Sequence, residues 1–472
     1  MNFETATPRA LTGKQTLFWL LVAVACFQVA YTSLRFPAAG WFILGYAFAL
    51  VRLTHQPTPR RAFYFGLAAG FFSYAPQFFF FWNIFQSAAM VLWLILAFWV
   101  ALFMLLANRC VHRWGPGKAA WLIPVVWTGL EYFRSEIYYF KFSWGNLGYA
   151  LPPATNFLGM YGTGFVIFLA AAASLHLTIR GKRQRIVRYG LLPLIIGTMV
   201  LNSGSRPAPN AVTLTGVQME FPAPGVVPKA LDHALAKNPD SKIFVLSEYT
   251  CDGPVPDPLK NWCRQNRRFL VVGAKDIVTN DVYYNTAFVI GTNGDIVFKQ
   301  AKSVPIQFFH DGRPAPRQEI WNSPWGKIGL CICYDLSFTR VTDRLVAQGA
   351  QLLIVPTMDV MEWGRHQHEL HARVAPVRAA EYGLPIFRLA SSGLSQAVTS
   401  RGEVIAQTHI GGQDETLTAR LGLPAHGTLP PDRYFAPLCA LGTAGIMAWL
   451  ISGLGQGKPV RKSDFDETSS RH

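Results

Sequence analysis

The chain has 472 residues, of which 51% are hydrophobic, 14% aromatic and only 15% charged. This composition is too apolar for an ordinary soluble multidomain protein, so part of the chain is expected to lie in a lipid bilayer. The net charge of +16 does not indicate nucleic-acid binding, because the basic residues fall mostly in short links between apolar stretches. The seven cysteines have neither zinc-site nor disulfide-framework spacing, so no structural metal is expected.

Seven apolar stretches precede residue 205 and predict membrane helices. They lie at residues 17–34, 41–53, 62–81, 89–107, 119–130, 158–177 and 189–201. The second, fifth and seventh are shorter than the roughly 20 residues that a bilayer requires, so their bounds are soft. The first lacks a small-residue cleavage site, which favours a retained helix over a signal sequence. One further apolar run, at residues 434–454, predicts a closing helix.

The basic residues predict the orientation of these helices. They gather near residues 9–14, 52–61, 109–118, 180–188 and 458–462, which are alternate connections. The positive-inside rule places these connections in the cytoplasm. The polar half then lies on the outer side, which is the periplasm if the protein sits in a Gram-negative inner membrane.

Four segments are predicted from this pattern. They are a multi-helix transmembrane domain (1–205), an extracytoplasmic polar domain (206–430), a C-terminal transmembrane helix (431–456) and a polar cytoplasmic tail (457–472). Within the second segment, seven short β-branched runs alternate with helical stretches such as residues 339–348 and 366–382. The expected fold class is an α-helical membrane domain plus an α/β domain, a layered sandwich of sheets and helices.

One apolar run, "KIGLCICYDLSF" at residues 327–338, contains two cysteines one residue apart. Strand alternation predicts Cys331 and Cys333 on one face, with Tyr334 and Leu336 on the other. The two thiols are not expected to bridge, because alternate residues of a strand lie roughly 6–7 Å apart at Cα. Two small core residues remain the alternative from this run alone.

Three residue types with complementary chemistry stand at predicted strand ends. Glu248 lies in "VLSEYT", Lys302 follows "NGDIVFKQA", and Cys333 precedes a tyrosine and an acid. A carboxylate can accept the proton of a thiol, and a nearby cation stabilises the thiolate that attacks a carbonyl. Taken singly, each residue is more typical of a solvated strand end. Lys299 is a rival for the cation, but alternation places it on the same face only with a bulge.

The order and context of these residues resemble the Glu-Lys-Cys triad of the nitrilase superfamily. Further similar stretches are "TMDVMEWG", "QHELHARVAPVRAAEYGLPIFRLASSG" and "TSRGEVIA", so the resemblance covers residues 210–410. It implies a nitrilase-like α-β-β-α sandwich with Cys333 as the nucleophile and Cys331 in the core. It also favours Lys302 over Lys299, whose distance from Gly294 is wrong for the family.

The apolar first half of the sequence resembles one particular family within this superfamily. The segment "WTGLEYFRSEIYYFKFSWGNLGYALPPATNFLGMYGTGFVIF" is similar to one in bacterial apolipoprotein N-acyltransferases, whose architecture of seven helices, an outer nitrilase domain and a closing helix matches end to end. The resemblance implies that Glu248 deprotonates Cys333, that the thiolate takes an acyl chain from a phospholipid, and that Lys302 stabilises the oxyanion. The acceptor would be the α-amine of a diacylglyceryl lipoprotein, with Glu248 as the base again and with no metal or diffusible cofactor.

The sequence departs from this family in three places. The loop "KSVPIQFFHDG" offers Gln307 where a glutamate is usual, Asp335 stands where glutamate is usual, and Glu220 stands where asparagine is common. Tyr334, Asp335, Trp363 and Gln307 are expected to support the site or to line a lid. These departures leave Glu248, Lys302 and Cys333 intact.

The cluster "HQHELH" contains His366, His368 and His371. A metal site is disfavoured, because His366 does not share a helix face with the other two and no carboxylate partner is evident. A lining role beside Trp363 is more plausible, and a solvated helix start is the favoured interpretation.

Two alternatives to acyl transfer stay open at the level of sequence. With water as the acceptor, the same triad would make a membrane-tethered amidase. A non-enzymatic relative that assembles conjugal transfer systems is the other alternative, which the intact Glu248, Lys302 and Cys333 disfavour.

Overall fold

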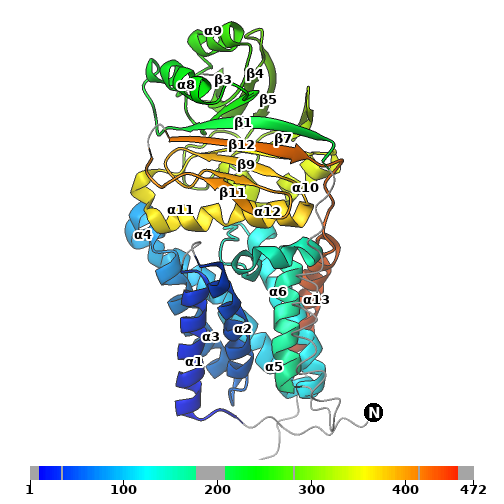
Figure 1. Cartoon of the computed structure of the whole chain (residues 1–472). Coiled ribbons are helices and arrows are strands. Elements are labelled where there is room, and N and C mark those ends of the chain that lie inside the picture. Colours follow the sequence, from blue (N-terminus) through cyan, green and yellow to red (C-terminus); the bar gives the residue numbers. More distant parts are fainter. Residues whose placement is uncertain (1–9, 33–35, 177–207, 280–281, 413–414, 455–472) are drawn as a thin grey trace, which may run out of the picture.

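The structure is a computed structural model that describes residues 10–32, 36–176, 208–279, 282–412 and 415–454. The first half is helical and contains α1 Gly13–Ala30, α2 Phe42–Leu53, α3 Pro59–Gln77, α4 Phe80–Phe85, α5 Ala89–Tyr132 and α6 Thr155–His176. The long helix α13 Asp432–Leu454 packs beside α5 and α6 at the end of the described chain (Figure 1). The predicted helix at residues 189–201 and the predicted tail at 457–472 lie outside the described residues.

Helices lie at the other six positions predicted in the first half. Two of those predicted helices are joined within α5, where Gly115 has a non-helical φ of 77° and ψ of 164° that glycine adopts without strain. Among the described residues, four helical segments are long and apolar enough to cross a membrane. They are Gly13–Ala30, Phe80–Ile137, Thr155–Leu175 and Asp432–Ser452.

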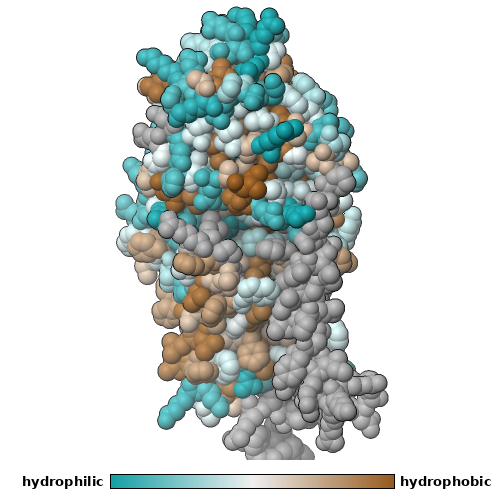
Figure 2. All heavy atoms as spheres, viewed as in Figure 1, coloured by the Kyte–Doolittle hydropathy of each residue, from teal (hydrophilic) through white to brown (hydrophobic). Residues whose placement is uncertain are grey.

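The helical half presents apolar side chains outward. Leu17, Phe18 and Leu21 of α1 are more than half exposed, as are Leu438 and Leu441 of α13. Figure 2 shows hydrophobic residues gathered over the helical half, whereas hydrophilic residues cover the opposite end of the molecule. Burying such a surface in lipid is favourable, so this half has the character of a membrane domain.

The second half contains two six-stranded sheets. The first has the order β12-β1-β2-β3-β4-β5 and the second β11-β10-β9-β8-β7-β6. The strands are β1 Asn210–Gln218, β2 Ile243–Leu246, β3 Phe269–Thr279, β4 Val282–Ile290, β5 Ile296–Ala301, β6 Ile320–Ser323, β7 Gly326–Leu330, β8 Leu352–Thr357, β9 Ile386–Ala390, β10 Gln396–Val398, β11 Val404–Gln407 and β12 Glu415–Leu423. All seven predicted β-branched runs lie in these strands.

Helices cover the outer face of each sheet. The first sheet carries α8 Val226–Lys237 and α9 Asp257–Asn266, and the second carries α10 Thr339–Ala347, α11 Arg365–Ala372 and α12 Val374–Tyr382. A separate apolar core fills the space between the sheets. The domain is therefore a four-layer α-β-β-α sandwich, as predicted, although the single helix expected over residues 366–382 is divided into α11 and α12.

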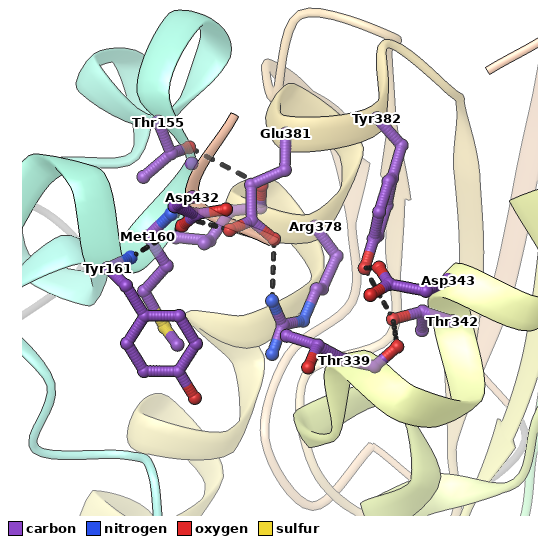
Figure 3. Close-up of polar contacts among 12 residues, drawn as sticks. Thr155, Met160, Tyr161, Thr339, Thr342, Asp343, Arg378, Glu381, Tyr382 and Asp432 are labelled. Atoms are coloured by element: carbon purple, nitrogen blue, oxygen red, sulfur yellow. Dashed lines mark hydrogen bonds and ion pairs between the residues drawn. The ribbon is translucent and has the colours of Figure 1, made fainter. Parts of the chain in front are cut away.

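The layer of α11 and α12 faces the membrane helices (Figure 1). Helix α6 is interrupted at Gly159, whose φ is 82°, so the next backbone N–H groups need partners from elsewhere. Figure 3 shows two carboxylates that supply them. Glu381 of α12 accepts a hydrogen bond from the Met160 N–H at 2.6 Å, and Asp432 of α13 accepts from the Tyr161 N–H at 2.8 Å.

Five charged residues at this junction form the junction cluster, which consists of Asp343, Arg378, Glu381, Asp432 and Arg433. The Arg433 guanidinium lies 2.9 Å from Asp343, 3.1 Å from Glu381 and 2.7 Å from Asp432. Arg378 bonds Glu381 and also donates to the carbonyl of Ser337 at 2.8 Å. The cluster fixes the sandwich domain against α6 and α13.

Candidate active site

Cys333 stands at a sharp turn after β7. Ile328, Leu330 and Ile332 point into the core between the sheets, as alternation requires. Cys333 then begins the short 3₁₀ helix η6 Cys333–Ser337 with a φ of +54°, a conformation that non-glycine residues rarely adopt. Its thiol lies 3.7 Å from the carbonyl oxygen of Met358.

The prediction that Cys331 and Cys333 share a face is wrong. Cys331 belongs to the core beside the helices, whereas Cys333 belongs to the core between the sheets. The alternation argument assumed that the strand continues through Cys333, but the positive φ turns the chain there. Both cysteines are buried, and the turn places only Cys333 at the wall of a pocket.

Glu248 follows β2 and is buried beside the thiol turn. Its Oε1 accepts hydrogen bonds from the Lys302 Nζ at 2.8 Å and the Asn285 Nδ2 at 2.6 Å. Its Oε2 accepts from the Met358 N–H at 2.8 Å. Strand β3 approaches so closely that a Cβ on Gly273 would lie 2.5 Å from the Glu248 Cα, which explains the glycine.

Lys302 follows β5 and is fully buried. Its ammonium lies 2.8 Å from Glu248 and 2.7 Å from Asp311. The rival Lys299 is 57% exposed at its side chain and pairs with Asp276, away from the thiol. The geometry therefore places Lys302, and not Lys299, beside Glu248.

Asp311 is a member of this cluster that sequence reasoning missed. It accepts from the Asn285 amide at 2.8 Å and from the Tyr249 hydroxyl at 2.9 Å, and it pairs with Lys302. The prediction that Gln307 takes the place of the family's glutamate is not supported, since Gln307 instead donates to the Tyr139 carbonyl. Asp311 is the only acid between Lys302 and Glu319, which could have identified it.

These groups, Glu248, Asn285, Lys302, Asp311 and Cys333, form the thiol cluster. Burial raises the pKa of Glu248, and the neighbouring Asp311 raises it further against the opposing effect of Lys302. Burial also raises the pKa of Cys333 well above its ordinary range, and the Glu248 carboxylate adds to this. At rest the cysteine is therefore a thiol beside a carboxylate with raised proton affinity.

Lys302 stays charged despite its burial. Burial alone lowers the pKa of Lys302, but the carboxylates of Asp311 and Glu248 outweigh it and hold that pKa well above its ordinary value. Burial raises the pKa of Asp311, and Lys302 outweighs this effect, so the Asp311 pKa is lowered. Lys302 and Asp311 therefore form the fixed ion pair, and Glu248 is the group free to take a proton.

The other predicted supporting residues hold the turn or line the pocket. Asp335 accepts from the N–H groups of Ser303, Val304 and Ile332, and so ties the chain after Lys302 to the cysteine turn. The Tyr334 hydroxyl donates to the carbonyl of Lys141 in the membrane half at 2.9 Å. Two further interactions fix the chain near the pocket: Asn83 donates to the Trp363 carbonyl, and Glu220 accepts from the Met361 N–H.

The histidine cluster is not a solvated helix start, contrary to the favoured prediction. His368 and His371 are buried, and His366 bonds to Gln77 of α3. Helix α11 packs against the membrane half, and its polar residues gave no indication of this contact in the sequence. Among the described residues, no group of three or more His, Cys, Asp or Glu side chains is placed to hold a metal ion.

An apolar pocket of about 890 Å³, including its open mouth, leads to the thiol. One wall comes from the membrane half and the other from the sandwich domain. The first consists of Phe80, Phe81, Ile84, Phe85, Leu92, Ile95, Leu96, Phe140, Lys141, Phe142 and Trp144. The second consists of Ile306, Gln307, Phe308, Phe309, Cys333, Tyr334, Trp363, Gln367 and His371. The Cys333 thiol is thus reached through a pocket built partly from apolar helices of the first half.

The fold and the thiol cluster define a nitrilase-type domain with a buried cysteine, carried on apolar helices. A carbon-nitrogen hydrolase family model matches residues 213–429, and a model of the apolipoprotein N-acyltransferase N-terminal domain matches residues 12–173. The chain belongs to the apolipoprotein N-acyltransferase family within the nitrilase superfamily, as its sequence predicted.

Curated relatives are similar over most or part of the chain. The chain is 24% identical to the apolipoprotein N-acyltransferase of Geobacter metallireducens, over 88% of this chain and 92% of that protein. It is 23% identical to the enzyme of the same name from Shewanella oneidensis, over 83% and 88%. It is also 28% identical to a deaminated glutathione amidase of Dictyostelium discoideum, but over only 32% of this chain and 60% of that protein.

Proposed function

We propose that this protein moves an acyl chain from a glycerophospholipid, through a thioester on Cys333, to the α-amine of a diacylglyceryl cysteine at the N-terminus of a lipoprotein. The observation that carries this proposal is the shared pocket, which opens between the membrane helices and the sandwich domain and ends at the thiol. A lipid acyl chain is apolar and flexible, and an aromatic and aliphatic lining stabilises it by burial.

In the first half of the reaction, Glu248 accepts the thiol proton of Cys333 and the thiolate attacks the ester carbonyl of the phospholipid. The proton then passes from Glu248 to the leaving glycerol oxygen as the ester bond breaks. Lys302, kept charged by Asp311, supplies the positive charge that stabilises the oxyanion. This step requires no cofactor. It exchanges the ester bond for a thioester bond, and the thiol proton passes through Glu248 to the leaving glycerol oxygen.

In the second half, the α-amine of the acceptor attacks the thioester and the acyl chain leaves as an amide. This amine has an unperturbed pKa near roughly 7.7–8.0, so a fraction is neutral and nucleophilic at neutral pH. Both substrates reside in a membrane, which accounts for the four apolar segments of the structure. The basic connections support a bacterial inner-membrane location with the sandwich domain in the periplasm.

A trapped thioester tests this proposal. Purified protein incubated with acyl-labelled phospholipid should become labelled, and hydroxylamine should remove the label. Cys333→Ala should abolish the labelling. Cys331→Ala is the matched control, because it removes a buried thiol outside the pocket wall and should still label. Label that depends on Cys331 would overturn the assignment of the nucleophile.

The fate of the acyl chain separates transfer from hydrolysis. The similarity to an amidase over a third of the chain makes water the competing acceptor. An acyltransferase should keep its thioester in detergent and discharge it when a diacylglyceryl-cysteinyl peptide is added, with the chain recovered as an amide. Free fatty acid released at the same rate with and without the peptide would support the hydrolase instead.

A further inference from the structure

The lining of the pocket that contains Cys333 includes a single charged residue type. Of the residues that line this pocket, Lys141 alone is a lysine, arginine, aspartate or glutamate. Lys141 follows α5 and lies beyond the apolar segment Phe80–Ile137. Its ammonium has neither an ion-pair nor a hydrogen-bond partner among the described residues. A cation beside an apolar pocket is stabilised by an anion, and the described residues supply none there.

Lys141 is tied to the turn that carries Cys333. Tyr334, the residue after Cys333, donates its hydroxyl to the Lys141 carbonyl at 2.9 Å. The Tyr334 ring packs edge-on against Phe338, with centroids 4.8 Å apart. The Arg340 guanidinium lies 5.8 Å from the centroid of the Phe338 ring. Tyr334 and Phe338 therefore connect a lysine of the membrane half with an arginine of the sandwich domain.

The charge of Arg340 acts on Lys141. Burial lowers the pKa of Lys141, and Arg340 lowers it further, against the opposing effect of Glu136. In the described chain Glu136 forms no ion pair with the lysine, and its Oε1 accepts from the Thr339 N–H at 3.1 Å and the Tyr161 hydroxyl at 3.0 Å. Arg340 is exposed and likewise has no ion-pair partner among the residues that the structure describes. Neighbouring cations disfavour each other's charge, so an anion bound beside them would stabilise both.

We propose that Lys141, assisted by Arg340, binds the phosphate of the phospholipid donor while the ester of that lipid lies at Cys333, a role that rests on the proposed acyl transfer. In a glycerophospholipid the phosphate is only a few bonds from the ester carbonyl, and Lys141 is one hydrogen bond from the residue after Cys333. The acyl chain occupies the apolar walls of the pocket. The acceptor brings an α-amine, which is cationic when protonated, so the two cations favour the donor over the acceptor before the thioester forms.

A donor without the phosphate tests this site. Acyl-labelled phosphatidylethanolamine and diacylglycerol, diluted in the same neutral detergent, carry the same ester chains, but only the first has a phosphate. In Lys141→Gln we expect kcat/KM for thioester formation to fall by about tenfold or more with the phospholipid, and to change by less than about twofold with diacylglycerol. The bond from Tyr334 is kept, because it is made to the backbone carbonyl. Lys141→Arg keeps the charge and should restore most of the loss.

Two controls accompany this comparison. Lys118→Gln changes an exposed lysine of α5 that does not line the pocket, and should behave as wild type with both donors. Inorganic phosphate at the concentration of the lipid should not slow labelling by the phospholipid. Inhibition by inorganic phosphate that is lost in Lys141→Gln would assign the site to free phosphate and would overturn the assignment to the donor lipid.

The remaining outcomes separate the site from the proposed function. Equal losses with both donors would overturn the phosphate site, because a lysine that only supports the fold serves either donor. Labelling of Lys141→Gln by the phospholipid at the wild-type rate would overturn it as well, and both results leave the proposed function in place. If diacylglycerol labels no variant, the loss in Lys141→Gln and its recovery in Lys141→Arg support the site. A wild-type protein that neither donor labels would overturn the proposed function itself.

Discussion

The thiol cluster and the junction cluster both bury carboxylates against cations, but their cations differ. The junction cluster uses Arg378 and Arg433, whose planar guanidinium groups hold several oxygens at once and stay charged. The thiol cluster uses Lys302, a compact charge with three donors. The junction carboxylates also accept backbone N–H groups of α6, so their bonds join two parts of the chain.

The two clusters differ more in their access to the apolar pocket than in their charges. The wall of the apolar pocket contains Cys333, but it contains no member of the junction cluster. Buried ion pairs are therefore weak evidence of a reactive site, because a structural contact needs the same pairing. What marks the thiol cluster is a cysteine in a turn with positive φ, at the wall of a pocket, next to a carboxylate with a raised pKa.

Removing the base should affect chemistry and not the fold. In Glu248→Gln we expect thioester formation to fall by roughly 10²–10⁴-fold, the range typical of general-base loss. Lys302 keeps its partner Asp311, so the thermal midpoint in detergent should hardly change. The measurement is the rate of labelling by acyl-labelled phospholipid. Labelling at the wild-type rate would show that another group takes the thiol proton.

Removing a junction cation should have the opposite effect. Arg433→Met leaves Asp343, Glu381 and Asp432 without a shared partner, and breaking a buried ion pair typically costs about 3–5 kcal/mol of unfolding free energy. We expect a lower midpoint of denaturation in detergent, with unchanged labelling per folded molecule. Lys299→Met is the matched control, since its exposed pair with Asp276 is worth about 0–1 kcal/mol. Lost labelling in fully folded Arg433→Met would contradict the separation of the clusters.

The sequence predicted the architecture because hydrophobic patterning is local. The hydrophobic pattern of each apolar run in the first half, and of each β-branched run in the second, is enough to predict that the run is buried. The residues around Glu248, Lys302 and Cys333 also resemble a known triad. The same local rule failed at Cys331 and Cys333, where one positive φ overrides strand alternation.

Contacts between distant segments could not be predicted in this way. Asp311 joins the thiol cluster because the loop after Lys302 folds back; its charge distinguishes it within that loop, but its spacing from Lys302 does not. Histidine is a polar residue type, so the sequence did not predict that His371 is buried. It is buried because α11 packs against Trp144 of the membrane half. The Arg433–Glu381 pair likewise connects segments 52 residues apart.

Neutralising Asp311 should shift a pH profile. Its charge raises the pKa of Glu248, so Asp311→Asn should lower that pKa. Glu248 then stays ionised to lower pH, and the acid limb of thioester formation moves to lower pH. Hydrogen bonds to charged groups contribute roughly 1.5–3 kcal/mol, so the plateau rate should fall by about tenfold or more as Lys302 loses a partner. The labelling rate measured across pH checks both effects. An acid limb that moves to higher pH would contradict the assigned electrostatics.

The smallest effect is expected at Gln307, and it tests which residue of the loop matters. Gln307 lines the pocket and donates to the Tyr139 carbonyl, whereas Lys302 pairs with Glu248 and Asp311. An exposed hydrogen bond of this kind is worth about 0.5–1.5 kcal/mol, so Gln307→Ala should change thioester formation by less than about tenfold. The acid limb of its pH profile should coincide with that of wild type, because no charge is removed. A loss as large as that of Asp311→Asn, with a shifted acid limb, would return Gln307 to the role first predicted for it. A small loss with an unshifted limb would instead leave Asp311 as the loop's contribution to the thiol cluster.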